Sequence, residues 1–369
     1  MRHSFALLGL GLIVGGIHGE TIPPSTGPYN VGARRFFVNH TMNGDPTSPN
    51  NISSGYLATV YYPTPDNKPC KPKPYLEPEL AQLYANLWNF NVSHLTATLR
   101  WDASFFPTSL GQTLLFGPGG WGPPSDGYTI LMSELASRGY VVAALDHIGE
   151  QPFLRLPNGT GIYGLALDYP ADLPFLMALN QLRVRETLHF IDYLPMLVAE
   201  LSAPFETTNL GTFGHSLGGS AALDAALESD LVTAAINLDG TNWGRMIEPN
   251  SNLGKPSLIL GAEGHTFEID PTWAYYAEEQ QDWWRLLIVN GTGHLDWSDA
   301  TIWKRFGSTR PLGPIDGERM VDITNAYVVA FFDEHLRGEE QPILNTPSAE
   351  YPEVDYIEIH EPDSRFRED

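Results

Sequence analysis

A serine flanked by glycines is the most reactive pattern in the chain. Residues 214–218 read Gly-His-Ser-Leu-Gly, and Gly219 extends the pattern. Glycines on both sides of a serine permit a turn too tight for side chains, so that the Ser216 hydroxyl points outward at the start of a helix. An apolar strand is expected to end at Phe213, and an Ala/Leu-rich helix is expected to begin at Ser220. This context favours a nucleophilic serine over an inert serine in a glycine-lined turn.

Four histidines follow this serine, and one of them is expected to act as its base. A serine hydroxyl is a weak nucleophile unless a histidine removes its proton and a carboxylate orients that histidine. His294 ends the segment Asn-Gly-Thr-Gly-His, just past an apolar strand, and a glycine-flanked loop can bring its ring over the serine. His265 is the alternative base, whereas His335 and His360 are expected on the surface.

Two carboxylates at strand ends are candidates for the acid that orients the base. Asp239 directly follows one apolar strand, and Glu263 follows the next strand, where many proteins of this architecture carry the acid. Position alone leaves both residues open. Asp296 and Asp299 lie so close to His294 in sequence that they are expected to cap a helix instead.

Two backbone N–H groups are needed to stabilise the charge that develops on the substrate carbonyl oxygen. Leu217, the residue after the nucleophile, is expected to supply one of them. The loop Gly-Pro-Gly-Gly-Trp at 117–121 is expected to supply the other. Because Pro118 has no N–H, the second donor is Gly120 or Trp121.

Aromatic side chains near these loops are candidates for a substrate pocket. Trp121, Trp243 and Trp297 stand close in sequence to the oxyanion loop, the acid and the base. The aromatic segment 75–106 could form an apolar wall for an acyl chain, a patch that touches lipid aggregates, or simple packing over the sheet edge.

The segments that must position these residues alternate between strand and helix. Strands are expected at 35–38, 56–62, 113–116, 140–145, 210–213, 234–238, 257–260 and 286–289, and helices at 80–99, 128–138, 181–201, 220–228, 273–282 and 323–336. This alternation predicts an α/β fold with a mostly parallel central sheet and helices on both faces. Ligands bind such sheets beyond the carboxyl ends of the strands. We expect one domain over residues 20–369, with insertions near 66–110 and 150–180.

Composition excludes several classes of function. The 369 residues include 44 acidic and 21 basic side chains, which gives a formal net charge of −23. Such a charge repels phosphate backbones, so nucleic acid is not an expected partner. The single cysteine, Cys70, excludes an intrachain disulfide framework and a multi-cysteine zinc site. Since no His-x-x-x-His spacing or dense His/Asp cluster is present either, we expect no metal and no cofactor.

The first nineteen residues are typical of a secretory signal peptide. Arg2 and His3 precede an apolar run at 6–14, and small residues follow up to Gly19. No later apolar run has the length of a membrane span, so a secreted protein is expected. The chain contains five Asn-x-Ser/Thr sequons, which add weak support for a secreted glycoprotein: Asn39, Asn51, Asn91, Asn158 and Asn290.

Three of these motifs together resemble the platelet-activating-factor acetylhydrolase family of secreted α/β-hydrolases. They are Gly-His-Ser-Leu-Gly-Gly at 214–219, Ile-Asn-Leu-Asp-Gly at 236–240 and Gly-His at 293–294. Further similar segments are Arg-Val-Arg at 183–185, Ile-Asp-Gly-Glu-Arg at 315–319, Asp-Ile-Thr-Asn-Ala at 322–326 and Phe-Phe-Asp-Glu-His-Leu at 331–336. The resemblance covers roughly residues 50–340 and implies the α/β-hydrolase fold. It also implies that Asp239 is the acid, since that family carries the acid one strand earlier than most.

The resemblance implies a serine esterase that removes short acyl groups from the middle (sn-2) carbon of platelet-activating-factor-like phospholipids, without a metal. The chain differs from that family in carrying Pro118 where those enzymes typically have a histidine. A small-molecule or lipid ester is the expected partner. One alternative keeps the triad in a general carboxylesterase, lipase or polyester hydrolase. Another is a secreted binding protein without catalysis.

Overall fold

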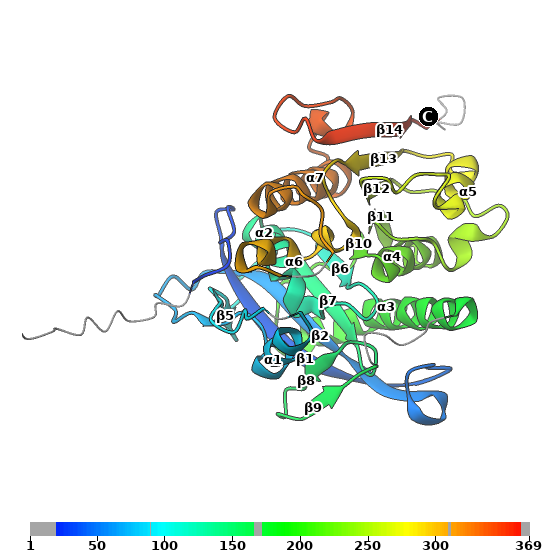
Figure 1. Cartoon of the computed structure of the whole chain (residues 1–369). Helices are drawn as coiled ribbons and strands as arrows, with labels where there is room; N and C mark the ends of the chain where they lie inside the picture. Colours follow the sequence, from blue (N-terminus) through cyan, green and yellow to red (C-terminus); the bar gives the residue numbers. More distant parts are fainter. Residues whose placement is uncertain (1–19, 89, 166–171, 309–310, 363–369) are drawn as a thin grey trace, which may run out of the picture.

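The computed structural model is built around a ten-stranded sheet (Figure 1). The structure describes residues 20–88, 90–165, 172–308 and 311–362, and the expected signal peptide at 1–19 lies outside them. In spatial order the strands are β14 (Val354–His360), β13 (Trp284–Val289), β12 (Ser257–Ala262), β11 (Val232–Leu238), β10 (Leu210–His215), β6 (Thr113–Gly117), β7 (Val141–His147), β2 (Ile52–Thr64), β1 (Asn30–Asn43) and β5 (Arg100–Trp101).

The middle of this sheet is parallel, as the alternation of strands and helices predicts. Strands β13, β12, β11, β10, β6 and β7 run in one direction. Strands β2 and β14 pair antiparallel at the two sides, and β1 pairs antiparallel with β2. The β14 strand corrects the expectation of a solvated tail around His360, because the ring Nδ1 of His360 lies 2.7 Å from the carbonyl oxygen of Asp282.

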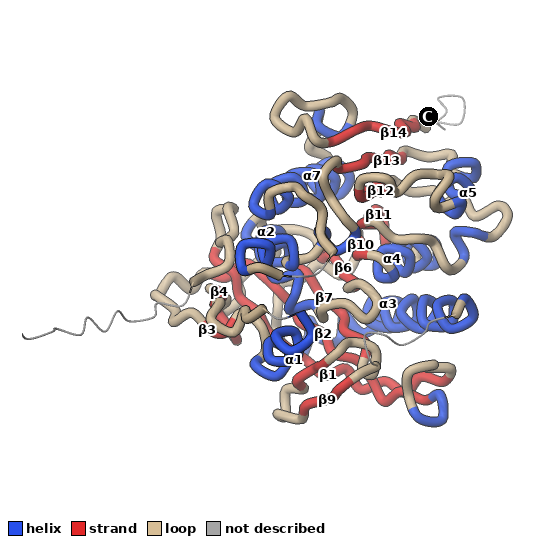
Figure 2. Tube along the Cα trace, in the orientation of Figure 1, coloured by secondary structure: helices blue, strands red, loops and turns tan. Residues whose placement is uncertain are grey.

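Helices cover both faces of the sheet (Figures 1 and 2). On one face lie α2 (Thr129–Ser137), α6 (Ala300–Trp303) and α7 (Gly317–Arg337), and on the other lie α3 (Leu173–Leu201), α4 (Leu217–Glu228) and α5 (Pro271–Glu279). Successive strand residues enter opposite cores. In β11, Ile236 and Leu238 pack with the α2 and α7 layer, whereas Ala235 packs with the α3 and α4 layer. Burial on both faces explains why these strands read as continuous apolar runs.

Helix α3 begins earlier than its periodicity predicts. The expected start was residue 181, whereas the helix begins at Leu173. Asp172 caps it by accepting the N–H of Phe175 at 2.9 Å, and the proline in the first turn suits that position. The side chains of the first turn are exposed or half-buried, so they lack the apolar spacing from which a helix would have been predicted.

The helix expected at 80–99 is shorter than predicted. Helix α1 spans Pro78–Trp88. After it, Asn91 accepts the N–H of Ser93 at 2.8 Å, a local turn that competes with helix continuation. The chain then forms β4 (Thr96–Ala97), which pairs with β3 (Lys73–Pro74). A second small element, the hairpin of β8 (Phe153–Arg155) and β9 (Gly161–Tyr163), lies in the other expected insertion.

A buried cluster of charges ties the end of β7 to α3 and to the connection between β1 and β2. The His147 ring places Nδ1 2.8 Å from Glu186 Oε1 and Nε2 3.4 Å from Asp45 Oδ1. Burial disfavours the charged ring, but the charges and hydrogen bonds of Glu186 and Asp45 raise the pKa of His147 to about 10. The imidazolium therefore holds three separate parts of the chain together at neutral pH.

The free energy of unfolding should fall between about pH 6.5 and about pH 10 as this ring loses its proton. A base whose pKa is raised by folding adds stability below its unfolded value and loses that stability as the pH rises through its folded value. Denaturant titrations over this range should show a smaller pH-dependent loss in His147→Gln than in the native protein. His189→Gln is the control, because the pKa of His189 is lowered by burial and its variant should keep the native slope. Equal slopes in native protein and His147→Gln would contradict this assignment.

Candidate active site

The turn between β10 and α4 holds Ser216 in a conformation that few residues other than glycine adopt. Its backbone has φ 56° and ψ −124°, and Ser216 is the residue that immediately precedes α4. A Cβ placed on Gly214 would lie 2.3 Å from the carbonyl carbon of Gly218, and one on Gly218 would lie 2.1 Å from the carbonyl oxygen of Gly117. The glycines predicted to make a tight turn therefore stand where side chains cannot fit.

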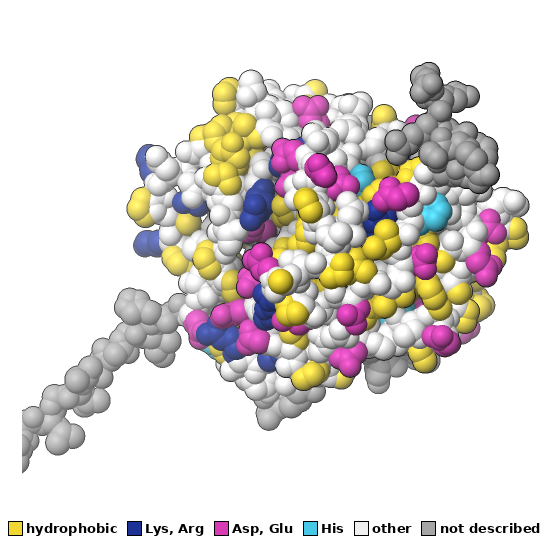
Figure 3. Space-filling view, turned by 90° about the horizontal axis from the view of Figure 1, so that it is seen from above, with side chains coloured by type: hydrophobic (Ala, Val, Ile, Leu, Met, Phe, Trp, Pro, Cys, Tyr) yellow, Lys and Arg dark blue, Asp and Glu magenta, His cyan; other side chains and the backbone are white. Residues whose placement is uncertain are grey.

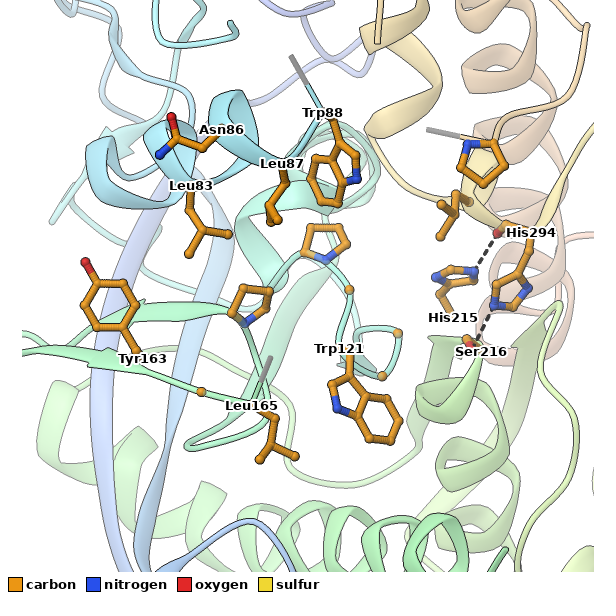
Figure 4. Close-up of a pocket in the computed structure, with 18 residues that line it drawn as sticks. Leu83, Asn86, Leu87, Trp88, Trp121, Tyr163, Leu165, His215, Ser216 and His294 are labelled. Carbon is orange, nitrogen blue, oxygen red and sulfur yellow. Dashed lines mark hydrogen bonds between the residues drawn. The ribbon is translucent and has the colours of Figure 1, made fainter. Parts of the chain in front are cut away.

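The structure brings together three predicted residues that lie far apart in the sequence. The Nε2 atom of His294 lies 2.9 Å from Ser216 Oγ (Figure 4). The Nδ1 atom of the same ring lies 2.6 Å from Asp239 Oδ2. His294 stands at the start of the short turn after β13, and Asp239 follows β11. The carboxylate is buried, whereas 47% of the His294 side chain is exposed toward the pocket. This is the geometry in which an imidazole can take a proton from a hydroxyl.

Backbone contacts fix Asp239 beside the serine turn. The N–H of Ser216 donates to the carbonyl of Leu238 at 2.8 Å, so the two loops are joined at their first residues. Asp239 itself has φ 57°, and a Cβ on the next residue, Gly240, would lie 2.2 Å from the carbonyl oxygen of Ser216. Burial favours the neutral acid, but hydrogen bonds from His265 and His294 hold the pKa of Asp239 well below its usual range.

Glu263, the other candidate acid, braces the loop before His294 instead of contacting the ring. Its Oε2 accepts the N–H of Gly291 at 2.6 Å, and its own N–H donates to Thr292 Oγ1 at 3.3 Å. Asp296 likewise accepts backbone N–H groups, from Gly293 at 2.8 Å. The geometry thus brings the carboxylate of β11, and not that of β12, to the imidazole.

His265 lies on the far side of the same carboxylate. Its Nδ1 is 2.7 Å from Asp239 Oδ1, and its Nε2 is 3.0 Å from Asp270 Oδ2. The ring does not take the place of His294 beside Ser216. The sequence suggested His265 only as an alternative base, and the spacing to Asp270 is the one signal that could have indicated a bridging role.

The candidate oxyanion loop, residues 117–121 after β6, is held by side chains whose bracing role the sequence did not identify. Arg183 donates to the carbonyl of Pro118 and, at 2.9 Å, to Glu150 Oε2. The N–H of Gly119 donates to Tyr128 Oη at 3.0 Å. Because that N–H is committed, Gly120 remains a candidate donor toward the pocket, together with the next residue along the loop.

A hydrogen-bonded chain links this loop to the candidate base. Tyr128 Oη lies 2.8 Å from His215 Nδ1. His215 Nε2 lies 2.8 Å from the carbonyl oxygen of His294 (Figure 4). Since that carbonyl can only accept, Nε2 of His215 carries the proton and Nδ1 accepts from the tyrosine. The residue before the serine therefore couples the oxyanion loop to the loop of His294.

A cavity of about 830 Å³ opens beside Ser216 and His294. Its walls come from α1, the oxyanion loop and the end of the β8–β9 hairpin, and Figure 4 shows the side chains that line it. Trp121, Trp88 and Tyr163 give the cavity an aromatic lining.

Two of the three predicted pocket tryptophans lie elsewhere. Trp121 lines the cavity, whereas Trp243 and Trp297 are absent from its lining in the described part of the chain. Trp297 is buried in the core beneath α7, because the turn after His294 directs it inward. Nearness in sequence to the candidate acid and base therefore did not predict which aromatic rings face the substrate.

No helix in the described ranges is long and apolar enough to cross a bilayer. Within the same ranges, His, Cys, Asp and Glu side chains do not gather into a group of three or more that could hold a metal ion.

Known proteins with similar sequences are named as esterases or acetylhydrolases. No family model matches the chain. A probable 1-alkyl-2-acetylglycerophosphocholine esterase of Arthroderma benhamiae is 29% identical over 267 residues, and the match covers 66% of each protein, just under two thirds. The platelet-activating factor acetylhydrolases of Cavia porcellus and Canis lupus familiaris are 23% and 22% identical, over 86% and 87% of this chain and 78% of each relative.

A solved structure shares the fold over nearly the whole chain. The ferulic acid esterase from Streptomyces cinnamoneus is 28% identical, with a TM-score of 0.78 over 92% of this chain and 100% of that one. The chain is therefore a carboxylic ester hydrolase with the α/β-hydrolase fold, and its sequence is similar to proteins named as platelet-activating factor acetylhydrolases and 1-alkyl-2-acetylglycerophosphocholine esterase.

Proposed function

We propose that the protein is a serine esterase that removes short acyl groups by way of an acyl-enzyme. One observation carries the proposal. Ser216 Oγ, the His294 ring and the Asp239 carboxylate form a continuous hydrogen-bonded line, at 2.9 and 2.6 Å, beside an aromatic-lined cavity. Such a line can raise the reactivity of a serine hydroxyl at neutral pH.

Each of these groups has a role in the proposed reaction. Ser216 attacks the ester carbonyl while His294 Nε2 takes its proton, and Asp239 stabilises the imidazolium that forms. The N–H groups of Leu217 and Gly120 bind the oxyanion, since Leu217 opens α4, where the first N–H groups have no carbonyl partner within the helix. His294 then returns the proton to the leaving alcohol, and a water activated by the same ring hydrolyses the acyl-enzyme.

The proposed substrates are platelet-activating-factor-like phospholipids with an acetyl or other short acyl group at the sn-2 carbon. The names of the curated relatives support this class. The cavity supports it as well, because the side chains of Leu83, Leu87 and Trp88 offer an apolar wall in the same cavity as Ser216 and His294. Leu87 and Tyr163 are 51% and 66% exposed, which is consistent with transient contact between the cavity rim and lipid aggregates.

An aromatic or general carboxylic ester is the second candidate substrate. Trp88, Trp121 and Tyr163 in the lining favour it, as does the likeness to a ferulic acid esterase. A lipase or polyester hydrolase would use the same reacting groups.

We propose a secreted protein without nucleic-acid partners. The net charge of −23 supports this, and acidic side chains are spread over the face shown in Figure 3. Asn91 and Asn158 lie exposed on loops where a glycan has room.

Replacing Ser216 by alanine should lower kcat/KM for acetyl esters by about four orders of magnitude or more, because the nucleophile is lost. The variant should melt like the native protein, since the hydroxyl faces the cavity. Initial rates on p-nitrophenyl acetate and on an acetylated phospholipid measure the loss, with Ser229→Ala as the control. An organophosphonate should label Ser216 in the native protein. Native-like turnover without Ser216, or no such adduct, would favour a binding protein on this fold.

Replacing Asp239 by asparagine should lower kcat by about three to four orders of magnitude, since a neutral amide neither fixes the His294 tautomer nor stabilises its charged form. The isosteric control is Glu263→Gln, which keeps an acceptor for the N–H of Gly291 and should retain near-native rates. Stopped-time assays on one acetyl ester compare the two. A larger loss of kcat in Glu263→Gln than in Asp239→Asn would indicate that Glu263, after β12, is the acid.

Truncating Leu87 to alanine should raise KM for an acetylated phospholipid by roughly fivefold and leave kcat unchanged. A half-exposed leucine in an apolar wall contributes about 1 kcal/mol of contact that is the same in ground and transition states. The small substrate p-nitrophenyl acetate should be unaffected. Leu231→Ala, just before β11 and outside the cavity, is the control. Equal effects on both substrates would contradict the proposed wall, and faster turnover of long-chain triglyceride would favour a lipase.

A further inference from the structure

We propose that His265 is a positioning residue of this esterase, and that it acts through Asp239. Held as an imidazolium between Asp239 and Asp270, it orients the acid and keeps His294 neutral, and so able to accept a proton, at lower pH. The inference rests on the proposed triad.

Hydrogen-bond geometry defines the protonation of the His265 ring. Its Nδ1 faces Asp239 Oδ1 at 2.7 Å, and its Nε2 faces Asp270 Oδ2 at 3.0 Å. An ionised carboxylate can only accept, so each ring nitrogen must donate, and an imidazole that donates from both nitrogens carries a positive charge.

The surroundings fix the ring in this bridging position. Trp273 stacks on it with ring centroids 3.7 Å apart and planes 18° apart, and the indole N–H donates to the carbonyl of Gly240 at 2.8 Å. Asp270 is held in turn, because its Oδ1 accepts the N–H of Thr272 at the start of α5. Rotation of the His265 ring would break contacts on both edges and on one face.

The carboxylate of Asp239 is consequently fully engaged. Oδ1 accepts from Ala262 N at 2.7 Å and from His265, while Oδ2 accepts from His294 at 2.6 Å. With Oδ1 held by two donors, one from the last residue of β12 and one from the loop that follows, Oδ2 stays aimed at the His294 ring. His265 thus fixes the plane of the Asp239 carboxylate. With His294 as its only partner, that carboxylate could rotate.

The His265 ring carries its positive charge because two carboxylates flank it. Burial works against the charged ring, but hydrogen bonds and charges from Asp239 and Asp270 raise the pKa of His265 to about 9. The charged groups that face the ring are Asp239 after β11 and Asp270 before α5. Glu263, on the same loop as His265, turns to the N–H of Gly291 instead.

A positive ring on one side of Asp239 weakens the pull of that carboxylate on a second positive ring. His294 must be neutral to take the serine proton, so its protonation sets the acid limb of the pH–rate profile. Without the His265 charge, Asp239 would stabilise the His294 imidazolium more strongly, and the acid limb would move to higher pH.

Two variants separate the charge of His265 from its contact. His265→Gln offers Asp239 a neutral N–H donor. Asp270→Asn keeps the His265 ring, and it keeps the helix cap because asparagine is as good a cap as aspartate. It removes the carboxylate oxygen that accepts from His265 Nε2, and with it the need for a proton on that nitrogen. In each variant the acid limb of kcat/KM for p-nitrophenyl acetate should move upward by about 0.5 to 1 pH unit. Plateau kcat should stay within about fivefold of native and KM should be unchanged.

The double variant and a control complete the test. His265→Gln with Asp270→Asn should shift the limb no further than either single variant, because both remove the same charge. His94→Gln, an exposed histidine outside the cavity, should leave the profile unchanged. Thermal melts verify that each variant is folded.

The outcomes distinguish this inference from the proposed function. A native acid limb in both single variants, with or without a lower plateau, would overturn the role of His265 and leave the esterase standing. No hydrolysis of any ester by the native protein, and no organophosphonate adduct at Ser216, would overturn the proposed function and this inference with it.

Discussion

Close approach of backbone where β6, β10 and β11 end is the constraint on which the site depends. A Cβ on Gly218 would lie 2.1 Å from the carbonyl oxygen of Gly117, and the N–H of Ser216 is bonded to Leu238. Three strand ends therefore meet without intervening side chains. This contact sets the oxyanion loop against the first turn of α4, and it places Asp239 one residue beyond the serine's own backbone partner. The positive φ angles at Ser216 and Asp239 are tolerated because neighbouring strands hold both residues in place.

Three clusters of buried, paired charges lie near this contact. Arg183 binds Glu150 and the oxyanion loop, His147 lies between Glu186 and Asp45, and Asp239 lies between two histidines. Transferring such groups from water is costly, and their mutual attraction offsets that cost only when geometry is good. We infer that these charged pairs are present beside the site because their directional hydrogen bonds fix the positions of the loops. Apolar packing alone would fix those positions less precisely. The same reasoning explains why Asp239 has two donors on one oxygen and the imidazole on the other.

The sequence predicted those parts of the candidate site that are marked by a short pattern of neighbouring residues. The glycines around Ser216 and before His294 mark tight loops at strand ends, and the alternation of apolar runs indicates a parallel sheet. The choice between Asp239 and Glu263 could not be made from position, because both follow buried strands and only side-chain direction separates them. The sequence did not predict that His265 bridges to Asp270, or that Arg183 holds the loop after β6. Contacts between loops produce no periodic pattern in the sequence from which they could be predicted. The early end of α1 and the strand β14 depended on local turns and on pairing with a distant partner.

In the proposed mechanism, chemistry and substrate selection come from different parts of this chain. The proposed reacting groups stand on strand ends of the sheet, whereas much of the cavity wall belongs to α1 and to the segment around β9. Changes in those outer segments can alter the bound ester without disturbing the distance between Ser216 and His294. Such a separation would allow one fold to act on different esters, and the proteins similar to this chain are named as acetylhydrolases in some cases and as a ferulic acid esterase in another. We therefore expect the aromatic wall of the cavity to determine which ester binds. We expect the hydrogen bonds around Asp239 to determine the rate of the chemical step.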